Sequence, residues 1–409
     1  MSETGLRIAL VSEHASPLAA LGGPDAGGQN VYIAALAHRL AVRGHQVVVY
    51  TRRDDPAIPD EVPCEHGYTV SHVRAGPPRA LVKDELLPHM PEFGERLGGL
   101  WRDAPPDVVH SHYWMSGLAA LHAAGPYGVP VVHTYHALGS VKRRHQGSAD
   151  TSPASRVQLE TALGQRCRQV LATCADEVAE LTELGVPADR VRVIPCGVDA
   201  EHFSPRPTPR QHTGGLLAVG RMVPRKGFDR AVRVLARLPG VELTIAGGPP
   251  AAELQNDPEA ERLRKLAAEH GVADRVRLLG AVPHEEMPEL MSQAALVLST
   301  PVYEPFGIVP LEAMACGTPV VATAVGGQLD TVADGETGLL LPPETGDGEL
   351  ADAVGALLAD PRRLAELGAA GRARVLDRFT WQQVAAQVDL AYREVARQPA
   401  ASHPDGGIR

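Results

Sequence analysis

This sequence of 409 residues lacks the features that mark membrane-spanning, secreted and disulfide-stabilised proteins. It has no apolar run that approaches the roughly 18 residues of a membrane-spanning helix. Residues 1–7 lead directly into an apolar strand pattern at 8–11, which leaves no room for a signal peptide. The five cysteines are odd in number, and none has the Cys-x-x-Cys spacing. Reduced thiols are the better interpretation, so we expect a cytoplasmic protein.

The sequence is also short of positive charge and of metal-binding motifs. It has 39 Lys and Arg against 49 Asp and Glu, a net charge of −10, which argues against a nucleic-acid partner. No Asp-x-Asp pair occurs, and the pairs His110/His112 and His133/His136 have no supporting ligands nearby in the sequence. We therefore predict no metal ion and no other cofactor. Strand-end histidines that hydrogen-bond substrate hydroxyls are the favoured alternative, and a homodimer is compatible with the sequence.

What the sequence does contain is an end-to-end alternation of short β-branched runs with helical patterns. This alternation predicts a parallel α/β architecture. The expected strands span residues 8–11, 47–50, 108–110, 131–134, 170–173 and 191–194, and then 216–219, 243–246, 276–279, 296–298, 320–322 and 339–341. Ligands of such sheets bind outside the carboxyl ends of the strands.

A composition break separates the two sets of strands. Alternating prolines at 205–209, followed by Gly214 and Gly215, are typical of an inter-domain linker. We therefore predict two Rossmann-like, doubly wound parallel-sheet domains that face each other across a cleft. Their expected bounds are 1–205 and 216–379, joined by a linker at 206–215. Residues 380–397 are expected to form a helix that packs back on the N-terminal domain, and 398–409 a disordered tail.

The most informative segment runs from Glu304 to Glu312. An apolar strand pattern at 296–298 precedes this segment. A loop is expected at 300–307 and a helix from Ile308 to Ala315. A helix N-terminus that follows a Phe306-Gly307 pair offers free backbone N–H groups and the positive end of a dipole, which suits a phosphate. Glu304 lies in the loop and Glu312 within the helix, so the two carboxylates can serve different parts of one elongated ligand.

Two other segments follow the first strand of each domain. Gly27-Gly28 precedes a helix pattern, where backbone N–H groups could approach a phosphate; a flexible turn is an equally good interpretation. Arg221 and Lys226 follow the strand at 216–219, where two fixed cations could neutralise a diphosphate leaving group. Solvated surface charge is the alternative there. The chain has no Gly-x-Gly-x-x-Gly after its first strand, so a dinucleotide site is not favoured.

Together these segments resemble the retaining nucleotide-sugar glycosyltransferases of family 4, which have the GT-B fold. The resemblance covers roughly residues 6–395. It rests on the Glu304–Glu312 segment, on Arg221 with Lys226, and on the Gly326-Gly327 turn. The segments 25–32, 110–114 and 133–136 are similar to one branch of that family. This branch holds sucrose-phosphate synthases, sucrose synthases and the mycothiol-pathway inositol-phosphate GlcNAc transferase.

The resemblance implies that the N-terminal domain binds the acceptor and that the C-terminal domain binds the nucleotide sugar. It implies catalytic roles for His136, Arg221, Lys226 and Glu304. It implies that the donor contacts Gly27, Gly28, Arg221, Lys226, Glu304, Phe306, Gly307 and Glu312, with Glu312 on the ribose. For the acceptor it implies Asn30, Lys83, Tyr113, Lys142 and Arg156.

The reaction implied by the resemblance is a metal-independent transfer of a hexosyl unit, with retention, from a nucleotide sugar to a small polar acceptor. UDP is the usual carrier in the family. The acceptor is expected to attack from the face of the leaving group, whose phosphate oxygen takes the proton. Lys83, Tyr113, Lys142 and Arg156 match residues that hold an acceptor phosphate, and surface charge is the alternative for the three cations. Ala137 stands where that branch has Thr or Ser, a loss of about 1 kcal/mol for one neutral hydrogen bond.

Three other functions are compatible with parts of this pattern. A natural-product glycosyltransferase would use an acceptor without a phosphate. A GT-B-shaped sugar-nucleotide epimerase would need no acceptor. A glycan-binding module without activity is disfavoured, because Glu304, Glu312, Arg221 and Lys226 are all present.

Overall fold

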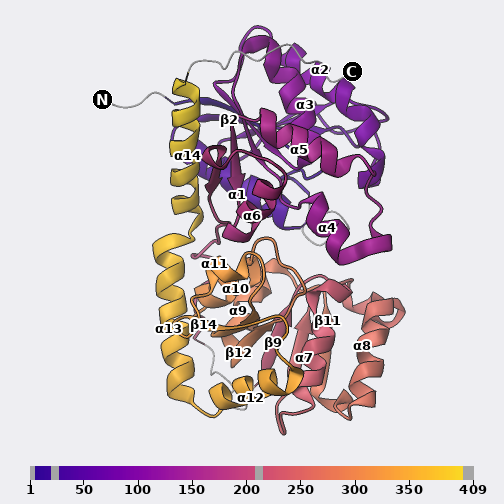
Figure 1. Ribbon diagram of the computed structural model, residues 1–409, viewed down its shortest axis with the longest axis vertical. Coiled ribbons are helices and arrows are strands. Elements are labelled where there is room, and N and C mark those ends of the chain that lie inside the picture. The colour runs from indigo at the N-terminus through magenta and orange to yellow at the C-terminus, as the bar shows by residue number, and fades with distance from the viewer. Residues whose placement is uncertain (1–4, 20–26, 208–214, 399–409) are drawn as a thin grey trace.

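The computed structural model describes residues 5–19, 27–207 and 215–398 of the chain. These residues form two α/β lobes that lie end to end along the long axis of the molecule (Figure 1). Most of the predicted linker, residues 208–214, and nearly all of the predicted tail, residues 399–409, lie outside the described ranges. Each lobe is built on one sheet with helices on both faces, so the predicted pair of Rossmann-like domains is confirmed.

The sheet of the N-terminal domain has eight strands in the order β3-β4-β2-β1-β5-β6-β7-β8. The strands are β1 (Arg7–Val11), β2 (Gln46–Arg52), β3 (Glu61–Pro63), β4 (Thr69–Val73), β5 (Val108–His112), β6 (Val131–Thr134), β7 (Gln169–Ala172) and β8 (Val191–Val193). Its helices are α1 (Gly28–Val42), α2 (Met90–Leu100), α3 (Trp114–Ala124), α4 (Gly139–Gln146), α5 (Arg156–Arg166) and α6 (Ala175–Glu183).

The sheet of the C-terminal domain has six strands in the order β11-β10-β9-β12-β13-β14. The strands are β9 (Leu216–Val219), β10 (Leu243–Ala246), β11 (Val276–Gly280), β12 (Leu296–Ser299), β13 (Val320–Thr323) and β14 (Gly338–Leu341). The helices that follow β9 are α7 (Phe228–Leu235), α8 (Pro258–Glu269), α9 (Met287–Gln293), α10 (Ile308–Ala315), α11 (Gln328–Thr331), α12 (Asp347–Leu358), α13 (Pro361–Arg378) and α14 (Trp381–Arg397). No helix within the described ranges is long and apolar enough to cross a membrane.

Every strand that the sequence predicts is present, and two strands at one edge were not predicted. β4 pairs with β2 in parallel, whereas β3 pairs with β4 in antiparallel orientation. β3 is therefore an exception to the prediction of parallel sheets. It has three residues, and β4 mixes polar with apolar side chains. Neither is the continuous apolar run by which a buried parallel strand is recognised.

Both faces of the central strand β1 are buried, as in a doubly wound sheet. Ile8 and Leu10 pack in one cluster with α1 and α14, while Ala9 and Val11 pack on the opposite face with α2 and α3. α14 thus completes the core of the N-terminal domain although it ends the described chain. Its first turn is fixed by Thr380, whose hydroxyl accepts the N–H of Gln383 at 3.3 Å. α13 and α14 run along one side of both lobes (Figure 1).

The two domains touch at the carboxyl ends of their strands. The Thr173 hydroxyl, just after β7, donates to the carbonyl of Pro305 in the other domain at 3.3 Å. The N–H of Ala175, the first residue of α6, donates to Asp330 of α11 at 2.6 Å. These contacts bring the strand-end loops of both sheets to one place, where parallel α/β sheets bind their ligands.

Candidate active site

Three neighbouring strands of the C-terminal sheet, β9, β12 and β13, bring the predicted donor segments together. Backbone hydrogen bonds join their loops: the N–H of Val302 donates to the Arg225 carbonyl at 2.9 Å, and the N–H of Gly327 donates to the Glu304 carbonyl at 2.8 Å. The loops approach so closely that a Cβ on Gly326 would lie 2.2 Å from the carbonyl oxygen of Glu304. Glycine is therefore needed in this turn, since the backbones must touch.

Glu304 and Lys226 form a largely buried ion pair at the centre of these loops. The Lys226 Nζ atom lies 2.5 Å from the Glu304 carboxylate. Burial alone raises the pKa of Glu304, but Lys226, Arg225 and the N–H of Phe306 outweigh burial and lower it below its ordinary value. Glu304 is therefore a carboxylate whose charge is already matched, and a ligand that engages Lys226 must share this cation with it.

Two helix N-termini meet at the same place. Gly307 precedes α10 in the left-handed conformation, with a φ of 66°, and Gly27 precedes α1. A Cβ on Gly28 would lie 3.2 Å from Ile308 and 3.6 Å from Phe306, so the two helix starts are in contact across the domain boundary. Their unpaired N–H groups and positive dipole ends together favour a bound anion.

Glu312 lies further along α10 and carries a carboxyl that no other described residue hydrogen-bonds. Part of the residue reaches solvent, yet burial raises the pKa of its carboxyl to about 8, and Lys226 only partly offsets this. Glu312 is therefore protonated at neutral pH until something stabilises its negative charge.

The other predicted donor cation, Arg221, is exposed. Within the described ranges it forms no ion pair with an acidic side chain. Arg225, which the sequence analysis did not single out, lies closer to the pair. Its guanidinium donates to the Tyr303 carbonyl at 3.5 Å, and it interacts electrostatically with Glu304. Three basic positions within six residues, Arg221, Arg225 and Lys226, therefore supply one exposed cation and two half-buried cations.

On the N-terminal side, His136 faces the donor loop. It follows β6 with a φ of 61°, unusual for a residue other than glycine, and its ring lies 5.6 Å from that of Phe306. Nε2 of His136 and Nδ1 of His112 are 2.9 Å apart. Burial, followed by repulsion from the imidazoles of His112, His133 and His14, lowers the pKa of His136 well below its ordinary value. His136 is therefore neutral.

The four histidines predicted to bind hydroxyls rather than metal make several contacts with one another and with hydroxyl groups. His110 bonds the hydroxyls of Tyr392 and Thr134 at 2.6 and 2.9 Å, and His133 bonds that of Ser111 at 2.8 Å. The described part of the chain has no group of three or more His, Cys, Asp or Glu side chains arranged to hold a metal ion. The buried Nδ1 of His136 has no hydrogen-bond partner among the described residues, so it can accept or donate a bond to a ligand.

Three of the predicted acceptor residues form one connected group. The Lys83 ammonium lies 4.9 Å from the ring centre of Tyr113, and the Arg156 guanidinium lies 5.3 Å from the same ring. Arg156 is buried and pairs with Glu160 at 2.7 Å. Its Nη2 donates to the carbonyl of Ala137 at 2.6 Å. The backbone of Ala137, the position that lacks the expected hydroxyl, is thus hydrogen-bonded to the predicted acceptor residue Arg156.

Lys142 joins this group through Ser152, whose hydroxyl accepts bonds from Lys142 Nζ at 2.9 Å and from Arg156 Nη1 at 3.1 Å. Lys142 also pairs with Asp150 at 3.0 Å. The pKa of Asp150 is about 2, because Lys142 and the Ser152 hydrogen bonds outweigh its burial. Lys142 and Arg156 therefore each have a carboxylate partner before any ligand binds, which makes surface charge a poor description of either.

Asn30 differs from the other acceptor candidates. It is buried, and its amide oxygen accepts the N–H of Gly27 at 3.0 Å while its amide nitrogen donates to the Ser16 carbonyl at 2.9 Å. Asn30 therefore holds the segment before α1 in place in this structure, and its contact with an acceptor stays a prediction.

A buried pair beside Tyr113, Glu13 with His14, was not predicted from the sequence. The Glu13 carboxylate lies 2.7 Å from Nδ1 of His14, and the His14 ring packs edge-on against Tyr113 with the ring centres 4.9 Å apart. An acidic residue next to a histidine after the first strand was the available signal, and it was visible in the sequence.

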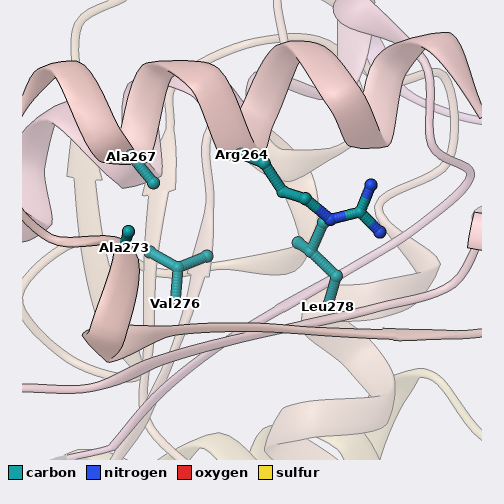
Figure 2. A pocket seen from close by; sticks show the side chains of 5 residues that line it. All are labelled: Arg264, Ala267, Ala273, Val276 and Leu278. Atoms are coloured by element: carbon teal, nitrogen blue, oxygen red, sulfur yellow. The ribbon is translucent and has the colours of Figure 1, made fainter. Parts of the chain in front are cut away.

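A separate pocket lies on the outer edge of the C-terminal domain and does not belong to this site. Figure 2 shows it between α8 and β11, lined by Arg264, Ala267, Ala273, Val276 and Leu278. Arg264 is its only charged side chain and already donates to the Leu254 carbonyl at 3.1 Å. Since the other four lining side chains are apolar and Arg264 already has a partner, this pocket offers no reactive chemistry.

Two family profiles match the chain, one for each lobe. "Glycosyltransferase Family 4" matches residues 26–202, and "Glycosyl transferases group 1" matches residues 204–374. The D-inositol 3-phosphate glycosyltransferase of Acidothermus cellulolyticus is 38% identical over 412 residues, which cover 96% of this chain and 91% of the relative. The chain belongs to the family 4 glycosyltransferases. The enzyme of the same name from Stackebrandtia nassauensis is also 38% identical, with 97% and 93% covered.

Solved structures show that this glycosyltransferase has the GT-B fold that the resemblance implied. Sucrose-phosphate synthase from Thermosynechococcus elongatus superimposes with a TM-score of 0.85 and 34% identity, covering 95% of this chain and 98% of that one. Anabaena HepE in complex with UDP and glucose superimposes with a TM-score of 0.74 and 21% identity, covering 95% and 99%. The named branch and the glycosyltransferase assignment are thus confirmed, and the individual residue roles stay predictions.

Proposed function

We propose that this glycosyltransferase moves a hexosyl unit from a UDP-linked sugar to a small polar acceptor that carries a phosphate, with retention and without a metal ion. One observation carries the proposal: two cationic groups occupy the two sides of the domain boundary. Lys226 and the starts of α1 and α10 form the donor side, and Lys83, Tyr113, Arg156 and Lys142 form the acceptor side. The names of the similar enzymes point to inositol phosphate as an acceptor of this chemistry.

On the donor side, negative charge grows on the diphosphate as the bond from the sugar C1 to its oxygen breaks. Lys226, the exposed Arg221 and the N–H groups at the helix starts stabilise that charge electrostatically. They supply positive charge of the kind that a metal ion provides in other phosphate sites, which supports metal independence. Lys226 reorients from Glu304 toward the diphosphate, and Glu304 is then available to hydroxyls of the donor sugar.

At the reacting carbon, the neutral His136 hydrogen-bonds the donor sugar through Nδ1, an assignment supported by the absence of a partner for this atom among the described residues. With the donor bound, Glu304 accepts hydrogen bonds from hydroxyls of the donor sugar and Glu312 accepts hydrogen bonds from the ribose, so neither carboxylate is free to act as a nucleophile at C1. The acceptor hydroxyl therefore attacks C1 from the face that the diphosphate leaves. Its proton passes to the departing phosphate oxygen, and the configuration at C1 is retained.

A second candidate is a glycosyltransferase whose acceptor has no phosphate. Two observations favour it: Ala137 offers no hydroxyl, and Lys142 and Arg156 already have the carboxylates of Asp150 and Glu160 as partners. Against it stands Lys83, which adds a third cation to the same group. Each charge-assisted hydrogen bond to a phosphate contributes about 1.5–3 kcal/mol. The first candidate should therefore strongly prefer a phosphorylated acceptor over the same acceptor without phosphate, and the second should not.

A matrix of donors and acceptors tests the proposal. UDP-, GDP- and dTDP-sugars are incubated with inositol 3-phosphate, hexose phosphates, and the same polyols without phosphate, and products are identified by mass spectrometry with and without EDTA. We expect a product from a UDP-sugar and a phosphorylated polyol, unaffected by EDTA. A new sugar epimer from donor alone would instead establish an epimerase, and exclusive use of unphosphorylated acceptors would establish the second candidate.

The raised pKa of Glu312 leads to a prediction about donor affinity. If its carboxylate accepts hydrogen bonds from both ribose hydroxyls, binding at neutral pH must first remove its proton, at about 1.4 kcal/mol per pH unit below the pKa. The affinity for a UDP-sugar should therefore increase about 25-fold from pH 6.5 to 8.5 and level off above the pKa of about 8. Titration calorimetry measures it, and Glu312→Gln should bind weakly and without this pH dependence. Wild-type affinity that is flat over this range would refute the ribose role.

A further inference from the structure

Glu13 is a completely buried carboxylate that the proposed reaction does not use. Its side chain is 0% exposed, and that of His14 is 7% exposed. One carboxylate oxygen lies 2.7 Å from His14 Nδ1, and the other accepts a short bond from the Ser116 hydroxyl in the first turn of α3. The N–H of Glu13 donates back to that hydroxyl at 2.9 Å. A buried charge of this kind is expensive unless its partners are fixed.

The partners of Glu13 determine the protonation pattern of the His14 ring. A carboxylate can only accept hydrogen bonds, so Nδ1 of His14 must carry the proton that lies between them. In the neutral ring, Nε2 then has a free lone pair. No described residue forms a hydrogen bond with Nε2, and the ring retains a small exposed edge. The pair therefore presents one acceptor atom of defined direction.

His14 lies between the two halves of the site. On one side its ring contacts Tyr113, which in turn is contacted by Lys83 and Arg156 of the acceptor group. On the other side it is near enough to His136, which faces the donor loop, to disfavour a positive charge there. In the proposed reaction, the attacking hydroxyl of an acceptor held by Lys83 and Arg156 would therefore lie beside His14.

We infer that Glu13 is a positioning residue for the acceptor: it holds His14 as the Nδ1–H tautomer, so that Nε2 accepts a hydrogen bond from a hydroxyl of a polyol acceptor. The inference rests on the proposed function and adds to it a device for orienting the hydroxyl. The hydroxyl keeps its proton while it is held. An orienting contact of this type acts on the geometry of attack, to which transfer rates are sensitive.

A purely structural role for Glu13 would predict a different set of effects. As a partner of Ser116 it would stabilise the start of α3, and its loss would lower the melting temperature without a specific effect on the acceptor. The tautomer of His14 distinguishes the structural role of Glu13 from its positioning role. Loss of Glu13 changes this tautomer only if Glu13 acts through the imidazole of His14.

The test uses Glu13→Leu, Glu13→Gln and His14→Ala in the full-length enzyme. Long-range ¹H–¹⁵N spectra of ¹⁵N-histidine-labelled protein, with His14 assigned by its absence in His14→Ala, report the tautomer. Glu13→Leu is expected to lose the Nδ1–H form and to raise the acceptor KM about tenfold, with UDP affinity within about twofold of wild type. Glu13→Gln retains an oxygen that accepts from Nδ1 and should stay within about threefold of wild type. In the His14→Ala background, Glu13→Leu should have no further effect on the acceptor KM.

A matched control exists in the same domain. His45 and Asp389 form another buried imidazole–carboxylate pair at 3.1 Å, and His45 lies beyond the far end of α1. Asp389→Leu should therefore lower stability and leave the acceptor KM unchanged. If Glu13→Leu does not fold, Glu13→Gln and His14→Ala carry the test.

Three results would overturn the inference: an unchanged tautomer in Glu13→Leu, an equal loss from Glu13→Leu with and without His14, or a wild-type acceptor KM in His14→Ala. The spectra do not depend on turnover. Absence of any transfer product would therefore contradict the proposed function, whereas an unchanged tautomer would contradict only this inference.

Discussion

Lys226→Ala is expected to reduce kcat for sugar transfer about 100- to 1000-fold. Removal of a single fixed group that stabilises developing negative charge typically costs about 2.7–4 kcal/mol in the transition state. Lys226 is the half-buried cation that the loops of β9 and β12 hold beside the start of α10. The fold should be largely retained, since the loops are joined by backbone hydrogen bonds that the substitution leaves in place.

The same substitution leaves Glu304 buried without its cation, which by itself destabilises the loop. The double variant Lys226→Ala/Glu304→Gln removes that unpaired charge, and it should recover stability without recovering transfer. Lys265→Ala, which changes an exposed lysine of α8 in the same domain, is the control and should be fully active. Turnover like that of wild type in Lys226→Ala would refute the diphosphate role, and recovery in the double variant would show that only the unpaired carboxylate mattered.

Gly227→Ala is expected to abolish most activity and to lower the free energy of unfolding by about 3 kcal/mol or more, through backbone strain and a direct clash. Gly227 has a φ of 70°, and a Cβ there would lie 1.8 Å from the carbonyl oxygen of Thr300. The loop after β9 and the loop after β12 would have to separate. Displacement of Lys226 from Glu304 by even about 1 Å is enough to cost on the order of 100-fold in rate.

Gly240→Ala is the control that separates the cost of the steric clash from the cost of placing alanine in a left-handed backbone conformation. Gly240 has nearly the same φ, 72°, but a Cβ there would meet no atom within 4 Å. It should therefore cost only the about 1–2 kcal/mol of a left-handed alanine and keep full activity. Thermal unfolding and initial rates measure both variants. Equal stability loss in the two, or an active Gly227→Ala, would show that the close approach of these loops is not needed for the site.

The fold was predictable because nearly every strand is a short apolar run that stands out between helical patterns. α10 begins and ends at the predicted residues, and α14 begins one residue after its predicted start, because Gly307 and Thr380 are the residues that precede the two helices. β3 and β4 were missed because they lie at an edge and mix polar with apolar residues.

The segments that form the site could be predicted from the sequence, but the contacts between their side chains could not. The sequence placed Lys226 and Glu304 at strand ends of one sheet, but their direct contact depends on β9 and β12 being neighbours. Likewise, the Ser116 hydroxyl donates a hydrogen bond to Glu13, which lies far away in the sequence. The Ser152 hydroxyl accepts bonds from both Lys142 and Arg156, and this contact depends on the conformation of the loop that carries Ser152. Periodicity and composition contain no information on contacts of this kind, which arise only when the sheet has assembled.

The central claim is that one site joins a UDP-linked sugar to a phosphorylated polyol with retention. One competition experiment tests it most directly: a UDP-α-sugar is supplied with equal concentrations of inositol 3-phosphate and inositol, in EDTA, and the product is analysed by NMR. The account predicts an α-linked product formed on the phosphorylated acceptor at least about 100-fold faster, the equivalent of about 2.7 kcal/mol. A β-linked product, or equal use of the two acceptors, would contradict it.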